Sequence, residues 1–210
     1  MSSRTEIRIT GFGGQGVVLA AYVTGRACAV HSGLHATMMQ SFGPEARGSA
    51  CSATLVISDC EVLYPYTKRP DILVAMSADG YEKYRDNLKD DGVLIYEKDL
   101  VQPVSREGQI LYGIPSTRIA ETLGRALVQN MVMVGFFAAV TRIISREAMR
   151  TAVKESAPAG TEELNLKAFD AGWDYFCAQY IHHEEHEESR SNAGEDLSEL
   201  RALRDFRGES

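Results

Sequence analysis

A glycine-rich segment near the start of the chain constrains the fold more than any other feature. Residues 7–10 read Ile-Arg-Ile-Thr, the alternation of a half-buried strand, and an apolar helix start follows at Val17. Glycines tolerate positive φ and let a ligand approach the backbone, while the N–H groups that open the next helix carry the positive end of its dipole. The segment therefore predicts a strand, turn and helix that hold an anion, with candidate binding residues Gly11, Gly13, Gly14, Gln15 and Gly16.

The spacing of these glycines also fits a dinucleotide-binding fingerprint. That fingerprint requires an acidic residue about 20 positions further on, at the end of a second strand, to hold a ribose hydroxyl. The second strand is expected over residues 35–40, which read His-Ala-Thr-Met-Met-Gln, and the next carboxylate is Glu45 in the following loop. The sequence therefore argues against an NAD or FAD site.

A second unusual loop, Ser41-Phe-Gly-Pro-Glu-Ala-Arg-Gly-Ser49, follows the second strand. Its glycines and proline set turn geometry, and its two charged residues are close enough to pair or to present one charge of each sign. The alternative is a surface turn with a weak ion pair. Because two special loops at one sheet edge indicate a site, Ser41 and Gly43 become candidate binding residues, and Glu45 and Arg47 candidate supporting residues.

Four segments in one order make the chain resemble a known family. They read GFGGQGVVLA, SFGPEARGSACSATLVIS, PDILVAMS and NMVMVGFFAAV, and are joined by a late Asn165–Gly172 stretch. Over about residues 6–180 the chain resembles the gamma subunit of 2-oxoacid:ferredoxin oxidoreductases. The loop from Ser41 looks more like the 2-oxoglutarate type than the pyruvate or indolepyruvate types, although Ser49 stands where a further glycine is usual.

The resemblance implies a subunit of an enzyme that converts 2-oxoglutarate, coenzyme A and oxidised ferredoxin to succinyl-CoA, carbon dioxide and reduced ferredoxin. Thiamine diphosphate, Mg²⁺ and iron–sulfur clusters then belong to partner subunits, alpha and beta with delta as a further candidate. This chain would bind none of them alone, would carry no catalytic residue of its own, and would support the active-site and CoA region. Two alternatives stay open: a gamma subunit acting with pyruvate, 2-oxoisovalerate or indolepyruvate, and a non-catalytic assembly adaptor.

Cysteine usage agrees with clusters held on other chains. The four cysteines are widely scattered, without a C-x-x-C pair, so no iron–sulfur or zinc run is readable. Cys28 and Cys51 are interpreted as small buried hydrophobes.

Charge and hydropathy exclude two further classes of function. The net charge of −7 argues against a nucleic-acid partner. The longest apolar run, residues 131–140, is shorter than the ~20 residues that span a bilayer, and the polar start lacks a signal-peptide core. A cytoplasmic location without membrane association is expected.

The last 29 residues form a polar tail outside the resemblance. Residues 182–210 hold nine acidic and four basic side chains, a net charge of −5. His182 and His186 invite a metal interpretation, but they lack the H-E-x-x-H order and are an incomplete ligand set, which favours a solvated charge run. Residues 195–207 have apolar side chains at three-residue spacing, which predicts a short amphipathic helix that docks on another subunit.

The remaining pattern predicts a three-layer α/β/α domain over residues 1–181, with a mixed, mainly parallel sheet and a helical C-terminal third. Residues 50–57 and 61–64 are expected to form a hairpin, and Ser116 and Ser145 to cap helices. The helix from Asn130 to Val140 is apolar around most of its circumference, which favours burial in this domain over contact with another chain. Asn130 is a candidate cofactor-binding residue that either caps this helix or orients the glycine turn.

Overall fold

The computed structural model describes residues 4–41 and 50–181. Its sheet has six strands in the order β2-β3-β1-β4-β5-β6. The β2–β3 and β3–β1 pairs are antiparallel and the other three pairs are parallel, so the expected mixed, mainly parallel sheet is confirmed. The strands are β1 (Arg4–Phe12), β2 (His35–Ser41), β3 (Ala50–Ser58), β4 (Ile72–Ala75), β5 (Val93–Glu97) and β6 (Ile110–Ile114).

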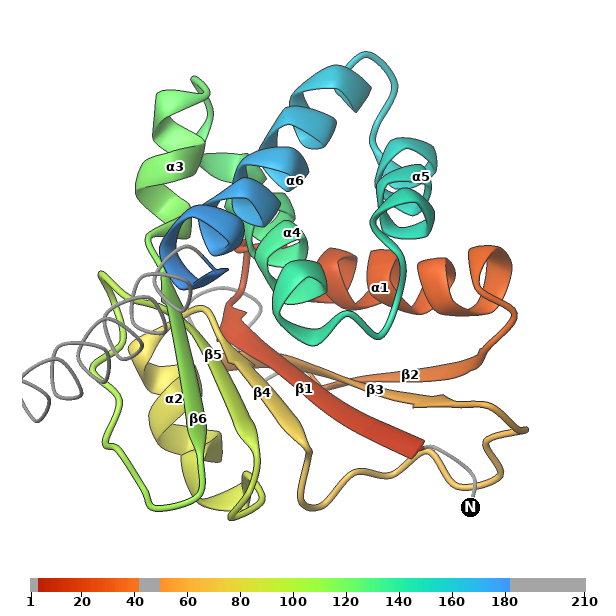
Figure 1. Cartoon of the computed structure of the whole chain (residues 1–210), viewed down its shortest axis with the longest axis vertical. Coiled ribbons are helices and arrows are strands. Elements are labelled where there is room, and N and C mark those ends of the chain that lie inside the picture. The colour runs from red at the N-terminus through yellow and green to blue at the C-terminus, as the bar shows by residue number, and fades with distance from the viewer. Residues whose placement is uncertain (1–3, 42–49, 182–210) are drawn as a thin grey trace, which may run out of the picture. The chain divides into compact units, whose positions relative to one another are not determined.

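Helices cover both faces of the sheet, which gives the expected three layers (Figure 1). On one face lie α1 (Val17–His31), α4 (Gln129–Thr141) and α5 (Arg146–Ser156), and on the other lies α2 (Ala78–Tyr84). The α2 face holds a core built around Leu73, Leu94 and Tyr81, while Ile9 and Val74 on the opposite face meet α1 and α4. The remaining helical elements are α3 (Ser116–Thr122), α6 (Glu162–Phe176) and short turns at Arg85–Asn87, Ala126–Val128 and Cys177–Ile181.

The expected hairpin is wrong. Residues 50–58 form β3, which pairs along its length with β1 on one side and β2 on the other, whereas residues 61–64 join no strand. Burial explains the difference: Leu55 and Val56 are at most 1% exposed, so both faces of β3 lie in the interior, whereas Leu63 is 85% exposed. A strand buried on both faces is best satisfied by a neighbour along each edge.

The apolar helix α4 is buried in this domain, as its composition indicates. Every residue from Asn130 to Ala139 is buried. Residues 162–174 of α6 approach it so closely that a Cβ added at Gly135 would lie 1.9 Å from the Phe169 carbonyl oxygen, and one at Gly172 would lie 1.9 Å from the Val132 carbonyl oxygen. The late Asn165–Gly172 stretch thus supplies a glycine that lets two helix backbones touch.

Two compact units divide the chain, residues 1–174 and 175–210. In the second, the described part ends with the π-helical turn Cys177–Ile181. His182, His186 and the expected helix over 195–207 lie outside the described residues, and the division at 181/182 stays a prediction.

Two further sequence expectations have structural outcomes. Cys28 and Cys51 are buried, as expected of small hydrophobes, and desolvation raises the pKa of Cys28 to about 12. Within the described ranges, no helix combines the length and the apolar character needed to cross a bilayer.

We predict that Gly135→Ala destabilises the chain by about 2–4 kcal/mol, because the new methyl group would force α4 away from the α6 backbone. Urea denaturation measures the change in the free energy of unfolding. Gly25→Ala is the matched helical control, since its Cβ would meet only the end of the Leu55 side chain, at 3.1 Å. Equal stability of the two variants would contradict the close helix contact.

Candidate functional site

The glycine turn and the ends of the second loop lie at one edge of the sheet. In the strand register, Ser41 is opposite Ser52, which is opposite Thr10, and Ala50 is opposite Phe12. The chain therefore leaves β2 and returns into β3 beside the turn that follows β1. This is the carboxyl edge of β1 and β2, where open α/β sheets bind ligands. Gly43, Glu45 and Arg47 lie outside the described residues, so their roles stay predictions.

Gln15 braces the glycine turn from within. Its Oε1 accepts a hydrogen bond from the Phe12 N–H at 2.7 Å, and its Nε2 donates to the Met76 carbonyl oxygen at 3.0 Å. Both ends of the amide are therefore engaged by the protein, which ties the turn to the end of β4. Gly11 makes room for this arrangement, because a Cβ there would lie 2.6 Å from Gln15 Oε1. These two candidate binding residues shape the turn.

Asn130 connects the glycine turn to α4. Its Nδ2 donates to the Gly16 carbonyl oxygen at 3.4 Å, and its Oδ1 accepts from the Met131 N–H at 3.0 Å. The side chain is 4% exposed and lies against Gly16, where an added Cβ would be 2.3 Å from Nδ2. Of the two roles open from the sequence, Asn130 orients the turn, whereas the cap role is wrong, because Val128 occupies the N-cap position of α4 and Asn130 lies inside the helix.

The outward part of the turn is made of backbone. Gly13 and Gly14 are exposed, and Gly14 has a φ of 101° with open space where a Cβ would point. The helix α1 that follows has Gly16 as its N-cap, without a side-chain cap and without an acidic residue in its first turn. The positive end of the α1 dipole is therefore uncompensated there, and the exposed turn is suited to an anionic group.

A buried carboxylate at the end of β5 was missed from the sequence. Glu97 is 1% exposed and accepts hydrogen bonds from the Ser116 hydroxyl and from the Thr117 N–H, the latter at 2.9 Å. The expected N-cap role of Ser116 is wrong, because Pro115 occupies the N-cap position and Glu97 accepts the Thr117 N–H in the first turn of α3 instead. Ser145 does cap α5, accepting from the Ala148 N–H at 3.2 Å. Glu97 acts as a structural cap.

Other residues of the family motifs make structural contacts that lie away from this edge of the sheet. Asp71 accepts from the Glu6 N–H at 2.7 Å and from Lys89 Nζ at 2.5 Å, which fastens the opposite, amino-terminal end of β1. Asn165 Nδ2 donates to the Thr161 carbonyl oxygen at 2.9 Å, at the start of α6. These two positions of the family resemblance are explained by hydrogen bonds and an ion pair that stabilise the fold.

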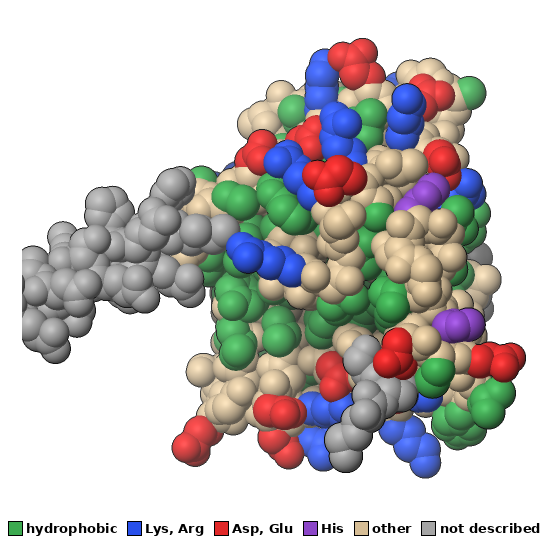
Figure 2. Space-filling model, turned by 45° about the vertical axis from the view of Figure 1, so that its right-hand side comes forward, with side chains coloured by type: hydrophobic (Ala, Val, Ile, Leu, Met, Phe, Trp, Pro, Cys, Tyr) green, Lys and Arg blue, Asp and Glu red, His purple; other side chains and the backbone are tan. Residues whose placement is uncertain are grey.

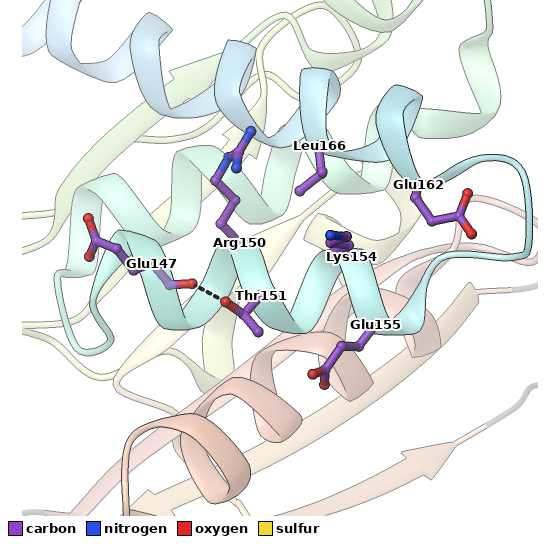
Figure 3. Close-up of a pocket in the computed structure, with 7 residues that line it drawn as sticks. All are labelled: Glu147, Arg150, Thr151, Lys154, Glu155, Glu162 and Leu166. Carbon is purple, nitrogen blue, oxygen red and sulfur yellow. Dashed lines mark hydrogen bonds between the residues drawn. The ribbon is translucent and has the colours of Figure 1, made fainter.

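A groove with a volume of about 680 Å³ lies between α5 and α6. Figure 3 shows that its walls carry charges of both signs. Two of these charges are paired: Arg150 Nη2 lies 3.1 Å from Asp170, and Arg26 donates to Glu155 at 2.7 Å and lowers the pKa of that carboxyl. The groove is lined by Glu147, Arg150, Thr151, Lys154, Glu155, Glu162 and Leu166.

The surface charge of the described residues is mixed on the face seen in Figure 2. Basic and acidic side chains lie side by side on the face seen in Figure 2, in keeping with the ion pairs of Arg146 with Asp170 and Asp174. In the described part of the chain, no three histidine, cysteine, aspartate or glutamate side chains converge to hold a metal ion. The glycine turn therefore stands as the main candidate site at the strand ends.

Fold and site define a class: an α/β domain that presents a glycine-rich, anion-accepting turn at the carboxyl edge of a mixed sheet. A family model described as "Pyruvate ferredoxin/flavodoxin oxidoreductase" matches residues 6–175. The chain belongs to this family, which confirms the resemblance drawn from the sequence motifs.

Relatives are similar over most of their length. The 2-oxoglutarate synthase subunit KorC of Methanothermobacter thermautotrophicus is 49% identical over 176 residues, covering 80% of this chain and 93% of that protein. The subunit of the same name from Methanocaldococcus jannaschii is 44% identical over 174 residues, covering 81% and 93%. The crystal structure of a keto/oxoacid ferredoxin oxidoreductase gamma subunit from Geobacter sulfurreducens has a TM-score of 0.74 at 35% identity, covering 83% of this chain and 99% of that one.

We predict that Gly16→Ala destabilises the chain by about 1–3 kcal/mol more than Gly14→Ala. Both glycines have positive φ, so both alanines are strained, but only the Gly16 methyl group would collide with Asn130. Paired urea denaturation curves measure the difference. Truncating Asn130 to alanine in the Gly16→Ala background should recover part of the loss, and strictly additive effects would contradict the contact.

Proposed function

We propose that this chain is the gamma subunit of a multisubunit 2-oxoglutarate:ferredoxin oxidoreductase. The observation that carries the proposal is near-complete coverage of 2-oxoglutarate synthase subunits at 44% and 49% identity. The reaction would convert 2-oxoglutarate, coenzyme A and oxidised ferredoxin to succinyl-CoA, carbon dioxide and reduced ferredoxin. The Gly-Pro-Glu-Ala-Arg-Gly sequence over residues 43–48 supports the same subtype.

The chain contributes support to the reaction and depends on partners for the chemistry. Thiamine diphosphate, Mg²⁺ and iron–sulfur clusters would be held by alpha and beta subunits, with delta as a further candidate, and ferredoxin would be reached through the complex. The assembly would work in the cytoplasm. The polar tail 182–210 would be a separate segment that docks on another subunit.

The glycine turn would receive an anionic group of coenzyme A. Exposed backbone at Gly13 and Gly14, beside the uncapped start of α1, supports this role because N–H groups and the helix dipole both favour phosphate oxygens. Gln15, Gly11 and Asn130 would act as positioning residues, since their side chains or their space are used within the protein. Ser41 and the loop that follows it would face the active-site chains from the same edge.

The substrate is tested by purifying the chain anaerobically with its partners and measuring CoA-dependent reduction of a viologen. The proposal expects turnover with 2-oxoglutarate to exceed that with pyruvate, 2-oxoisovalerate and indolepyruvate by about tenfold or more, the discrimination that a site binding a polar group of its substrate gives. Preference for another 2-oxoacid would keep the family and overturn the subtype. Assembly without any turnover would favour an adaptor.

The coenzyme A role is tested with Gly14→Asp in the assembled enzyme. A carboxylate at the turn would repel phosphate, so we predict that KM for CoA rises about tenfold or more while the complex stays intact. Gly124→Asp is the matched control, because Gly124 also has positive φ and open space at its Cβ position but lies after α3. An unchanged KM for CoA in Gly14→Asp would remove this role and leave the turn as a brace.

A further inference from the structure

A small polar cavity lies on the sheet face that α2 covers only in part. Its volume is about 190 Å³, and its walls come from β1, β2, β3, residues 66–67 and the end of α2. On one side the register places Met39, Thr54 and Arg8 in one row across three strands, with Ser41 and Ser52 in the next row of the same face. The cavity is rich in hydroxyl groups, from Ser41, Ser52, Thr54, Tyr66, Thr67 and Tyr84.

Arg8 is the charged group of this cavity. Its Nη2 donates to the Thr67 carbonyl oxygen at 2.9 Å, and its guanidinium carbon lies 4.5 Å from the centre of the Tyr84 ring. Its Nε is buried and has no hydrogen-bond partner. In the described part of the chain, Arg8 has no carboxylate within ion-pair distance, whereas Arg4 on the same strand pairs with Glu6.

A cation in this position calls for a counter-charge. Partial burial lowers the pKa of Arg8, yet a guanidinium remains charged at neutral pH, so a partly desolvated positive charge lies at the cavity. The Tyr84 ring attracts the cation but brings no negative charge. Arg8 is part-buried, and its buried Nε lacks an acceptor, so an anion in the adjacent cavity would supply both an acceptor and a counter-charge.

The hydroxyl groups supply the rest of an anion site. Thr67 Oγ1 is buried without a hydrogen-bond partner, which leaves a donor free beside the guanidinium. Ser52 Oγ and Tyr84 Oη are 3.0 Å apart and hold each other in place. The described lining residues include no aspartate or glutamate, so nothing among them would repel an anion.

We propose that this cavity is a binding site for the carboxylate of a small organic acid, anchored by Arg8 and Thr67. One guanidinium matches the single charge of a carboxylate better than the double charge of a phosphate. The volume corresponds to roughly six water molecules, which suits an acid of a few carbon atoms. The site stands apart from the glycine turn and does not rest on the proposed function.

The test is isothermal titration of the purified full chain with succinate, propionate and inorganic phosphate at constant ionic strength. We expect saturable binding of succinate or propionate. Arg8→Gln should weaken it about tenfold or more and Thr67→Val several-fold, the effects of losing a charged and a neutral hydrogen bond. Arg118→Gln removes an exposed arginine of α3 that pairs with Asp99 and does not line the cavity, so it should leave the dissociation constant unchanged.

Several results would overturn the site. They are absence of saturable carboxylate binding to the native chain, phosphate binding more tightly than either acid, and equal weakening in Arg8→Gln and Arg118→Gln. If Arg8→Gln does not fold, Thr67→Val decides, because it removes a hydroxyl that makes no hydrogen bond in the chain and should keep native stability. The titration measures binding to the chain alone, so its failure is distinguishable from failure of the oxidoreductase assignment.

Discussion

The contact between Asn130 and Gly16 is the constraint on which the rest of the site depends. It joins positions that are 114 residues apart and brings the first turn of α4 against the end of the glycine turn. Glycine is needed at position 16 on two counts, a φ of 76° and the absence of a Cβ that would strike the Asn130 amide. Since α4 is buried along nearly its whole length, this contact joins the turn to the hydrophobic core.

The consequence is a site whose side chains point inward and whose backbone points outward. Both ends of the Gln15 amide are hydrogen-bonded within the protein, to Phe12 and Met76. Both ends of the Asn130 amide are likewise bonded, to Gly16 and Met131. What remains open is the backbone at Gly13 and Gly14 beside the uncapped start of α1. Such a surface can hold an anion in place, but it offers no general acid, base or nucleophile, which suits a subunit that works within a larger enzyme.

Local pattern was sufficient for the parts of the fold that a single segment determines. The glycine turn, the buried helix α4 and the Ser145 cap all follow from spacing and composition over a few residues. The pairing of β3 does not, because its neighbours β1 and β2 are chosen by burial on both faces and not by the adjacent residues 61–64. Ser116 failed as a cap for a related reason, since Glu97 arrives from another strand.

Arg8 and Glu97 escaped prediction because each looks ordinary in its strand. An arginine between two isoleucines is usual in a strand with one exposed face. Only the register of β1 with β3 places Arg8 beside Thr54 and the hydroxyl-lined cavity. Glu97 ends an apolar strand and could equally face solvent.

The roles of Gly43, Glu45 and Arg47 stay predictions from sequence. The sequence places them in a family that the match over residues 6–175 confirms, and the described chain reaches only Ser41 before them, opposite Ser52.

The central claim is that the Asn130-oriented turn contributes to turnover without performing the chemistry. It is tested most directly by reconstituting partner subunits that lack this chain with increasing amounts of either native chain or the Asn130→Ala variant. The account predicts no activity from the chain alone, and saturation of both titrations at the same ratio, with a lower plateau of CoA-dependent turnover for the variant. Equal plateaus for the native and Asn130→Ala chains would contradict it.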